Sequence, residues 1–165
     1  MKADSQDATS QVTATLLMVA LTVILAALIL LCFHLPDMDW EYTEPPVIFR
    51  IEQITSPQPT FESLIYLRNV VEKDYPNREL SAKIYSNDEL LPCTILTLNT
   101  HDFISTAHYG VSTLSREGGN GDFWHYNQLL RIDISNGYIH PGDEVRVDII
   151  ETESGTVISR DAIEA

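Results

Sequence analysis

One uncharged apolar stretch near the front of the chain limits what the chain can fold into. Residues 12–31 read VTATLLMVALTVILAALILL, without a charged side chain. A helix rises about 1.5 Å per residue, so roughly 20 such residues span about 30 Å, the thickness of the hydrocarbon core of a bilayer. The stretch therefore predicts a membrane-spanning helix, which we place at residues 8–35 behind a short leader at residues 1–7.

The charges on either side of this stretch predict its orientation. Lys2 precedes it, and four acidic residues follow it: Asp37, Asp39, Glu41 and Glu44. The positive-inside rule then places the N-terminus in the cytoplasm and the chain beyond Pro36 outside. A cleaved secretory signal is disfavoured because no Ala-x-Ala follows the apolar run. A lipoprotein signal is disfavoured because the bulky Leu31, and not a small residue, precedes Cys32.

The order of residues in the stretch is more specific than its apolarity. Residues 17–27 read Leu-Met-Val-Ala-Leu-Thr-Val-Ile-Leu-Ala-Ala, behind the acidic Asp7. This order resembles the N-terminal signature of archaeal type IV pilins, in which an acidic residue and Ala-Val-Ser-Pro-Val-Ile-Gly precede Leu-Met-Val-Ala-Ile-Thr-Val-Ile-Leu-Ala-Ala. The chain departs from the signature at Gln11, where the family favours Pro, and at Ala14, where it favours Gly.

The resemblance implies a processing step and a set of partners. In the family, a prepilin peptidase cuts on the cytoplasmic side after a basic and a small residue, which Lys2 and Ala3 match, so that Asp4 would become the first residue. The resemblance also implies a cytoplasmic assembly ATPase and a multi-span platform protein. The alternative is that Lys2 is only a topological charge and that nothing is cut.

An apolar helix of this kind predicts assembly once it leaves lipid. A helix that is apolar all round must be buried among other apolar groups, and copies related by a rotation that does not close form an open filament. The residues that we expect in such a filament core are Val12, Leu16, Leu17, Val19, Ala20, Val23, Ile24, Ala26, Ala27 and Leu30. The prediction is a pilin-like structural subunit on the cell surface, with single-pass membrane storage before assembly. The alternative is a membrane-anchored binding module that does not polymerise.

Charge and cysteine content exclude several classes of partner and scaffold. The formal net charge is -14, and the chain has three lysines, so nucleic acid and anionic membrane surfaces are not expected partners. Cys32 and Cys93 are too few to form a disulfide framework. We expect Cys93 to be a small buried hydrophobe, the usual condition of a free cysteine.

Beyond a proline-containing linker at residues 36–46, the pattern changes from helical to extended. Short runs rich in branched and aromatic residues alternate with turn signals, which is typical of an all-β sandwich. Strands are expected at 47–54, 63–71, 80–85, 91–98, 103–111, 129–134, 144–150 and 156–159. The predicted fold class is therefore α+β: a long hydrophobic N-terminal helix followed by an Ig-like sandwich domain at residues 47–165.

The sequence contains no constellation that predicts catalysis, a metal or a cofactor. His101, Asp102, His108, Asp122 and His125 lack the spacing of a zinc helix. No serine occupies a Gly-x-Ser-x-Gly elbow, and no phosphate-binding loop is present. We therefore expect that the protein is not an enzyme and has no cofactor.

A glycine-rich segment in the second half of the chain is the candidate for an exposed contact surface. Residues 118–122 read Gly-Gly-Asn-Gly-Asp, which we interpret as a flexible loop, since calcium-binding glycine repeats need several aligned copies. The candidate contact residues are Asn120, Asp122, Phe123, Trp124 and Tyr126. The alternative is that the aromatic residues belong to the core, because large aromatic side chains are buried on average.

Overall fold

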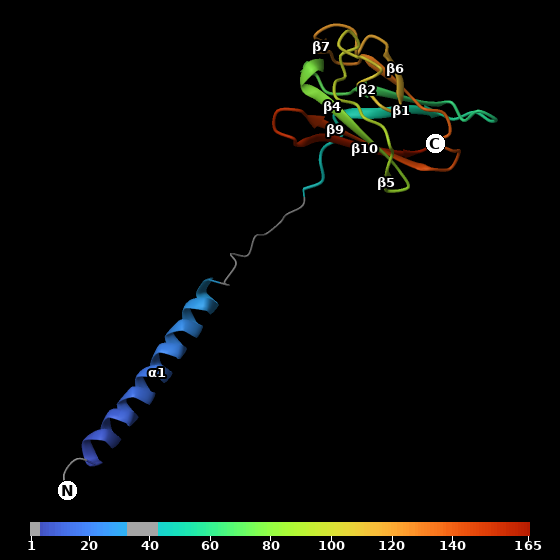
Figure 1. The fold of residues 1–165 in the computed structure, drawn as a ribbon. Coiled ribbons are helices and arrows are strands. Elements are labelled where there is room, and N and C mark those ends of the chain that lie inside the picture. Colours follow the sequence, from blue (N-terminus) through green and yellow to red (C-terminus); the bar gives the residue numbers. More distant parts are fainter. Residues whose placement is uncertain (1–3, 33–42) are drawn as a thin grey trace. The chain divides into compact units, whose positions relative to one another are not determined.

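The computed structural model describes residues 4–32 and 43–165 and divides the chain into two compact units, Met1–Tyr42 and Thr43–Ala165. The first contains the helix α1 (Asp4–Cys32), and the second, here called the β domain, contains all ten strands of the described chain (Figure 1). The predicted α+β class is confirmed. The predicted leader residues Lys2 and Ala3, and residues 33–42 of the predicted helix end and linker, lie outside the described residues.

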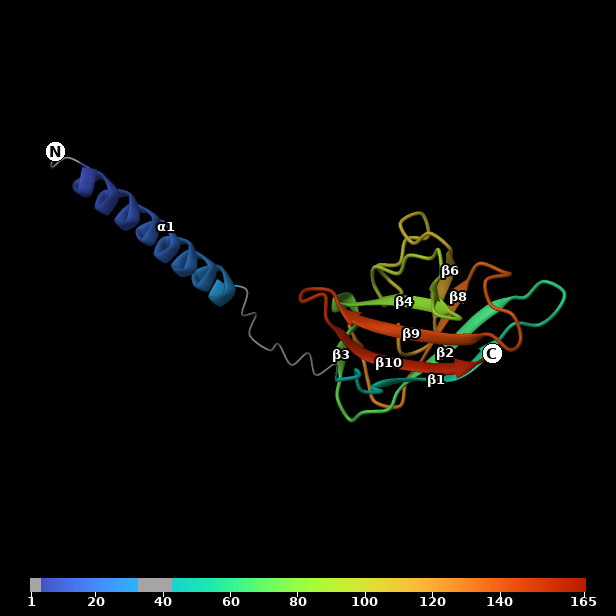
Figure 2. The same cartoon turned by 90° about the horizontal axis from the view of Figure 1, so that it is seen from below.

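The β domain is built from two four-stranded antiparallel sheets and one short strand pair. The first sheet has the order β1 (Phe49–Thr55), β2 (Ser63–Asn69), β8 (Leu129–Ile134) and β6 (Val111–Ser115). The second has the order β10 (Val157–Glu164), β9 (Glu144–Glu151), β4 (Leu80–Ser86) and β5 (Glu89–Leu90). The pair is β3 (Tyr75–Pro76) with β7 (Phe123–Trp124), and a 3-10 turn η1 (Asn77–Glu79) follows β3. Figure 2 shows β4, β9 and β10 running side by side.

The core forms because both sheets alternate apolar and polar residues. In β2, Ile65 and Leu67 are buried while Tyr66 between them is partly exposed. In β9, Val145 and Val147 are buried while Arg146 between them is partly exposed, and both valines join the same hydrophobic cluster. Full burial of each such side chain contributes about 1.5 to 3 kcal/mol. One apolar core thus holds both sheets together, as in a sandwich.

Side chains of β10 close the edge of the first sheet at β1. The Ser159 hydroxyl oxygen accepts hydrogen bonds from the backbone amides of Ile48, at 3.0 Å, and Phe49, at 2.9 Å. The Asp161 carboxylate accepts from the amide of Ile51 at 2.8 Å. Because these donors are satisfied within the chain, the first half of the β1 edge, up to Ile51, is not open to pairing with another strand.

The two strands predicted at residues 91–98 and 103–111 are wrong. Residues 91–110 instead form an irregular segment that packs on the core, here called the cover. At residues 91–98 the only ladder contact described is a single bridge between Ile95 and Ala82. At residues 103–111 the chain forms turns, and β6 begins only at Val111. The strand-like alternation at 91–98 arises because Ile95 and Leu98 are buried while Leu96 is exposed.

Candidate functional site

The helix α1 is the first candidate site, because none of its described side chains, residues 10–30, is buried. Its window Ser10–Leu30 has 21 residues and a mean hydropathy of 2.6, and every side chain in it is exposed. By length and composition this window can cross a membrane. At about 100° per residue, Met18, Leu21 and Leu25 lie on a different side of the helix from Val19 and Val23, so no polar face remains.

The predicted filament-core residues all lie within this window. They are exposed in the isolated chain: Val12, Leu16, Leu17, Val19, Ala20, Val23, Ile24, Ala26, Ala27 and Leu30. What covers them is not part of the described chain. An apolar surface of this extent is not stable in water, so it requires lipid or another apolar helix.

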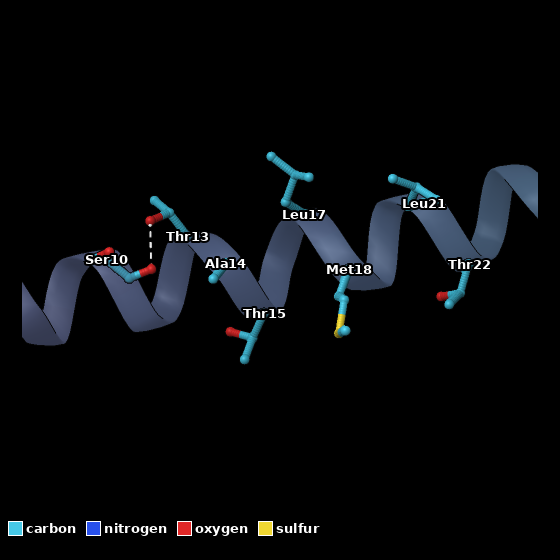
Figure 3. Close-up of a pocket in the computed structure, with 8 residues that line it drawn as sticks. All are labelled: Ser10, Thr13, Ala14, Thr15, Leu17, Met18, Leu21 and Thr22. Atoms are coloured by element: carbon cyan, nitrogen blue, oxygen red, sulfur yellow. Dashed lines mark hydrogen bonds between the residues drawn. The ribbon is translucent and has the colours of Figure 1, made fainter.

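The threonines of α1 satisfy their hydroxyl groups within the helix. The Thr13 hydroxyl donates to the carbonyl oxygen of Ser10 at 2.9 Å, and the Thr22 hydroxyl donates to that of Val19 at 2.8 Å. Figure 3 shows this part of the helix, with Leu17 and Met18 pointing to opposite sides. Because the hydroxyls donate locally, they add little cost in an apolar medium. They therefore do not prevent this helix from residing in lipid or in a helical bundle.

The second candidate site is the segment between β6 and β8, residues 116–128, here called the aromatic loop. Its anchor is Trp124, which is 0% exposed and stacks on Phe49 with ring centroids 4.3 Å apart. The Trp124 indole N–H donates to the carbonyl oxygen of Gln128 at 2.9 Å. The prediction that Trp124 is an exposed contact residue is therefore wrong, because its ring fills the core.

Three buried asparagines fix the backbone of the aromatic loop. The side-chain amides of Asn77 and Asn99 both donate to the carbonyl oxygen of Gly121, at 3.2 and 3.1 Å. The Asn69 amide donates to the carbonyl oxygen of Trp124 at 3.2 Å. Sequence reasoning missed these residues, because an asparagine in a loop gives no signal that its amide is buried. Their bonds hold the loop in one conformation.

The first two glycines of this loop serve close packing, which corrects the interpretation of residues 118–122 as flexible at these two positions. A Cβ atom on Gly118 would lie 2.4 Å from Nε1 of Trp124. A Cβ atom on Gly119 would lie 2.6 Å from Cγ2 of Thr100. Both glycines are buried, and both are required because larger residues would displace their neighbours.

The remaining predicted contact residues lie on the surface of the aromatic loop. Phe123 is 48% exposed and Tyr126 is 51% exposed, while Asn120 and Asp122 are also exposed. Aromatic residues on a fixed backbone lose little conformational entropy on binding, which suits a contact surface. The structure therefore keeps Asn120, Asp122, Phe123 and Tyr126 as one exposed set, here called the loop tip.

The histidines and aspartates that could suggest chemistry are dispersed. The His108 ring is buried, with Nδ1 2.9 Å from the carbonyl oxygen of Ile104. His125 lies 2.8 Å from Asp74, and Asp102 pairs with Arg78 at 2.6 Å. Within the described residues, no group of three or more His, Cys, Asp or Glu side chains could hold a metal ion. Cys93 is half-buried against the core, and burial raises the pKa of its thiol to about 11.

Comparisons with known proteins give only a distant likeness. No family model matches the chain, and no curated protein is significantly similar in sequence. The solved archaellum periplasmic stator protein complex FlaF and FlaG from Sulfolobus acidocaldarius matches at 11% identity with a TM-score of 0.44, over 74% of this chain and 94% of that chain. The archaellum periplasmic stator protein FlaG from the same organism matches at 13% identity with a TM-score of 0.41, over 70% of this chain and 97% of that chain. A likeness at this level carries no argument about what this chain does.

Proposed function

We propose that the chain is a structural subunit of an archaeal type IV pilus-like surface filament. In this proposal α1 is stored in the membrane and then packs with copies of itself as the filament core, while the β domain faces outward. The observation that carries the proposal is the pilin-like residue order of Leu17–Ala27 on a helix that is apolar all round. The chain is not an enzyme in this proposal, and other proteins supply the processing and the energy for assembly.

Helix packing supports the proposal energetically. Once the helix has left lipid, each leucine or isoleucine in the bundle is held there by about 1.5 to 3 kcal/mol relative to exposure to water, whereas the transfer from lipid itself gains only packing. Ala20, Ala26 and Ala27 are small enough to let neighbouring helices approach closely. A filament with such a core would be stable without covalent links between its subunits.

The first test is the N-terminus of the native protein, compared between membranes and sheared surface fibres. We expect fibres that contain this chain beginning at Asp4, and full-length chain in the membrane. The variant Lys2→Glu should block cleavage and abolish the fibres, whereas the matched control Lys2→Arg should retain both. Chain that keeps its first residues, stays in the membrane and is absent from fibres would show instead a non-polymerising anchor.

The loop tip would make the surface contacts of the filament. The double variant Phe123→Ser with Tyr126→Ser should reduce the adhesion of cells to a solid surface without changing the number of fibres, because both side chains are exposed. The control is Leu90→Ser, which removes a side chain of similar exposure, 54%, from β5. Equal loss of adhesion in both variants would contradict a specific role of the loop tip.

A further inference from the structure

The outer face of the first sheet carries three arginines, of which Arg50 has no ion-pair partner in the described chain. Arg68 pairs with Glu52, and the positive charge of Arg131 interacts with Asp133, two residues along β8. Arg50 in β1 lies directly opposite Arg68 in β2. Two residues along β2, Tyr66 lies opposite Arg131 in β8. The side chains of Ile65 and Leu67 point into the core, so those of Tyr66 and Arg68 point outward. We call Arg50, Tyr66, Arg68 and Arg131 the arginine face; Figure 1 shows the position of this sheet in the β domain.

The arginines of the described chain divide sharply by partner. Four of them form ion pairs: Arg68 with Glu52, Arg78 with Asp102, Arg146 with Asp88, and Arg160 with Asp148. Among the described residues, Arg50, Arg116 and Arg131 have no carboxylate oxygen within 4.0 Å. Arg50 and Arg131 lie on strands of the first sheet, and Arg116 begins the aromatic loop directly after β6.

Arg50, Arg116 and Arg131 lack a close ion pair in the described chain although acidic residues are abundant. The chain has 24 acidic residues and 10 basic ones. Like charges directly opposite each other in a sheet are destabilising, as at Arg50 and Arg68. The exposed Arg50 and the partly exposed Arg131 therefore have capacity for an anion from outside the chain.

We propose that the arginine face docks against the acidic surface of a second copy of this chain. A guanidinium group binds a carboxylate through two parallel hydrogen bonds, and the net charge of -14 means that a second copy presents carboxylates. Tyr66 and Leu129, which is the cross-strand partner of Arg68, supply apolar contact beside the charges. Copies held in one membrane or fibre meet at high effective concentration, so weak ion pairs are enough to hold this contact.

The sign of the charge determines the symmetry of this contact. Two arginine faces repel each other, so the face must meet a different surface of the next copy. Such a heterologous contact can repeat without closing, and it therefore extends into an open row. The contact itself does not require a filament. Its role, an open row of β domains along a filament, rests on the proposed function.

Carbodiimide cross-linking of the full-length protein tests the contact, because this reagent joins an amine to a carboxylate only where the two are paired. Arg50→Lys and Arg131→Lys each place an amine on the arginine face. The matched control is Arg78→Lys, whose position already pairs with Asp102 in the same chain. We expect cross-linked dimers from the first two variants and intrachain products from the control. The yield of dimers should fall as the salt concentration rises from 0.1 to 1 M, because the Debye length shortens from about 10 to 3 Å over this range.

The cross-linking is carried out both on membranes and on sheared fibres, so that this contact and the filament are tested separately. Dimers in membranes without any fibres would support the contact and contradict the filament. Fibres whose position-50 and position-131 variants yield only intrachain products would support the filament and overturn the contact.

A charge reversal tests the choice of partner. The double variant Arg50→Glu with Arg131→Glu should weaken association of the full-length chain about tenfold, as expected for two lost surface ion pairs and the added repulsion. The variant Arg78→Glu is the control. Unchanged self-association in the double variant, with lost binding to a sulfated polysaccharide column, would overturn the proposal and identify a soluble polyanion as the ligand of this face.

Discussion

Replacing Gly118 by alanine tests the packing that holds the aromatic loop. The new Cβ atom would lie 2.4 Å from Nε1, 2.8 Å from Cδ1 and 2.9 Å from Cε2 of Trp124. The indole ring cannot shift freely, because it stacks on Phe49 and donates a hydrogen bond to Gln128. Gly118 has no positive φ, so the cost arises from this steric clash and not from backbone strain.

The magnitude follows from what the indole must lose. Overpacking costs about 1 to 3 kcal/mol, a hydrogen bond about 1 kcal/mol and an aromatic pair about 0.5 to 1.5 kcal/mol. Because these losses are partly alternatives to one another, we expect the free energy of unfolding to fall by about 3 kcal/mol. For a chain of this size the midpoint of thermal unfolding should fall by about 10 °C.

The assay is urea unfolding of the full-length protein in detergent micelles, followed by near-ultraviolet circular dichroism. The same substitution is made in a Trp124→Leu background, where the smaller side chain leaves room for the Cβ atom, so the cost of Gly118→Ala should largely disappear. Gly155→Ala is the comparison for backbone strain without a clash, since Gly155 has a φ of 68° and nothing lies within 4 Å of its Cβ, so its cost should persist in the Trp124→Leu background. If alanine at position 118 only restricted the unfolded chain, the substitution would be neutral or stabilising. That result would refute the described packing.

Three further predictions concern charged and titrating groups of the β domain. Asp148→Asn should destabilise the domain by about 3 kcal/mol in urea unfolding, because Arg160 donates two hydrogen bonds of 2.7 Å to the almost fully buried Asp148. Cys93 should not react with iodoacetamide at pH 8 until the domain unfolds, and stability should fall as the pH rises from 9 toward 11, because the unfolded thiol ionises first. The backbone amide of His140 and then the side chain of Asn87 lower the pKa of Asp143, so this carboxylate should contribute stability above its ordinary value of 3.8 and lose it as the pH falls through its lowered pKa.

Each of these predictions has a matched control. Asp102→Asn removes an exposed ion pair and should change stability by less than about 1 kcal/mol, so an equal loss at both sites would contradict the role of burial at Asp148. Cys93→Ala should remove the loss of stability above pH 9, and a persistent slope would assign it to another group. Asp143→Asn should flatten the acid limb of the stability profile, and an NMR titration that finds an ordinary pKa at Asp143 would contradict its hydrogen bonds.

Regular strands could be predicted from the sequence wherever one face is buried and the other wet. The predicted strand at residues 129–134 coincides with β8, because Leu130, Ile132 and Ile134 alternate with partly exposed residues. The strand expected at 156–159 is longer in the structure, as β10 continues to Glu164. Its second half could not be predicted, because exposed residues such as Ala162 give no apolar alternation.

Sequence patterns led to wrong expectations where contacts between distant segments determine the local structure. The cover at residues 91–110 has strand-like residues and buries Leu91, Ile95 and Leu98 in the core, but it pairs with the second sheet only through a single β-bridge in the described chain. Gly118 and Gly119 were interpreted as flexible, since a sequence does not distinguish a glycine needed for close approach from one needed for a turn. The buried asparagines and the unpaired arginines depend on contacts between distant segments, which no local pattern encodes.

Electron cryo-microscopy of sheared cell-surface fibres tests the central claim most directly. The account predicts a fibre whose axis is a bundle of α1 helices, with residues 17–27 buried between copies and the β domains on the outside. A fibre whose axis is built from another chain, with α1 remaining in the membrane fraction, would contradict it.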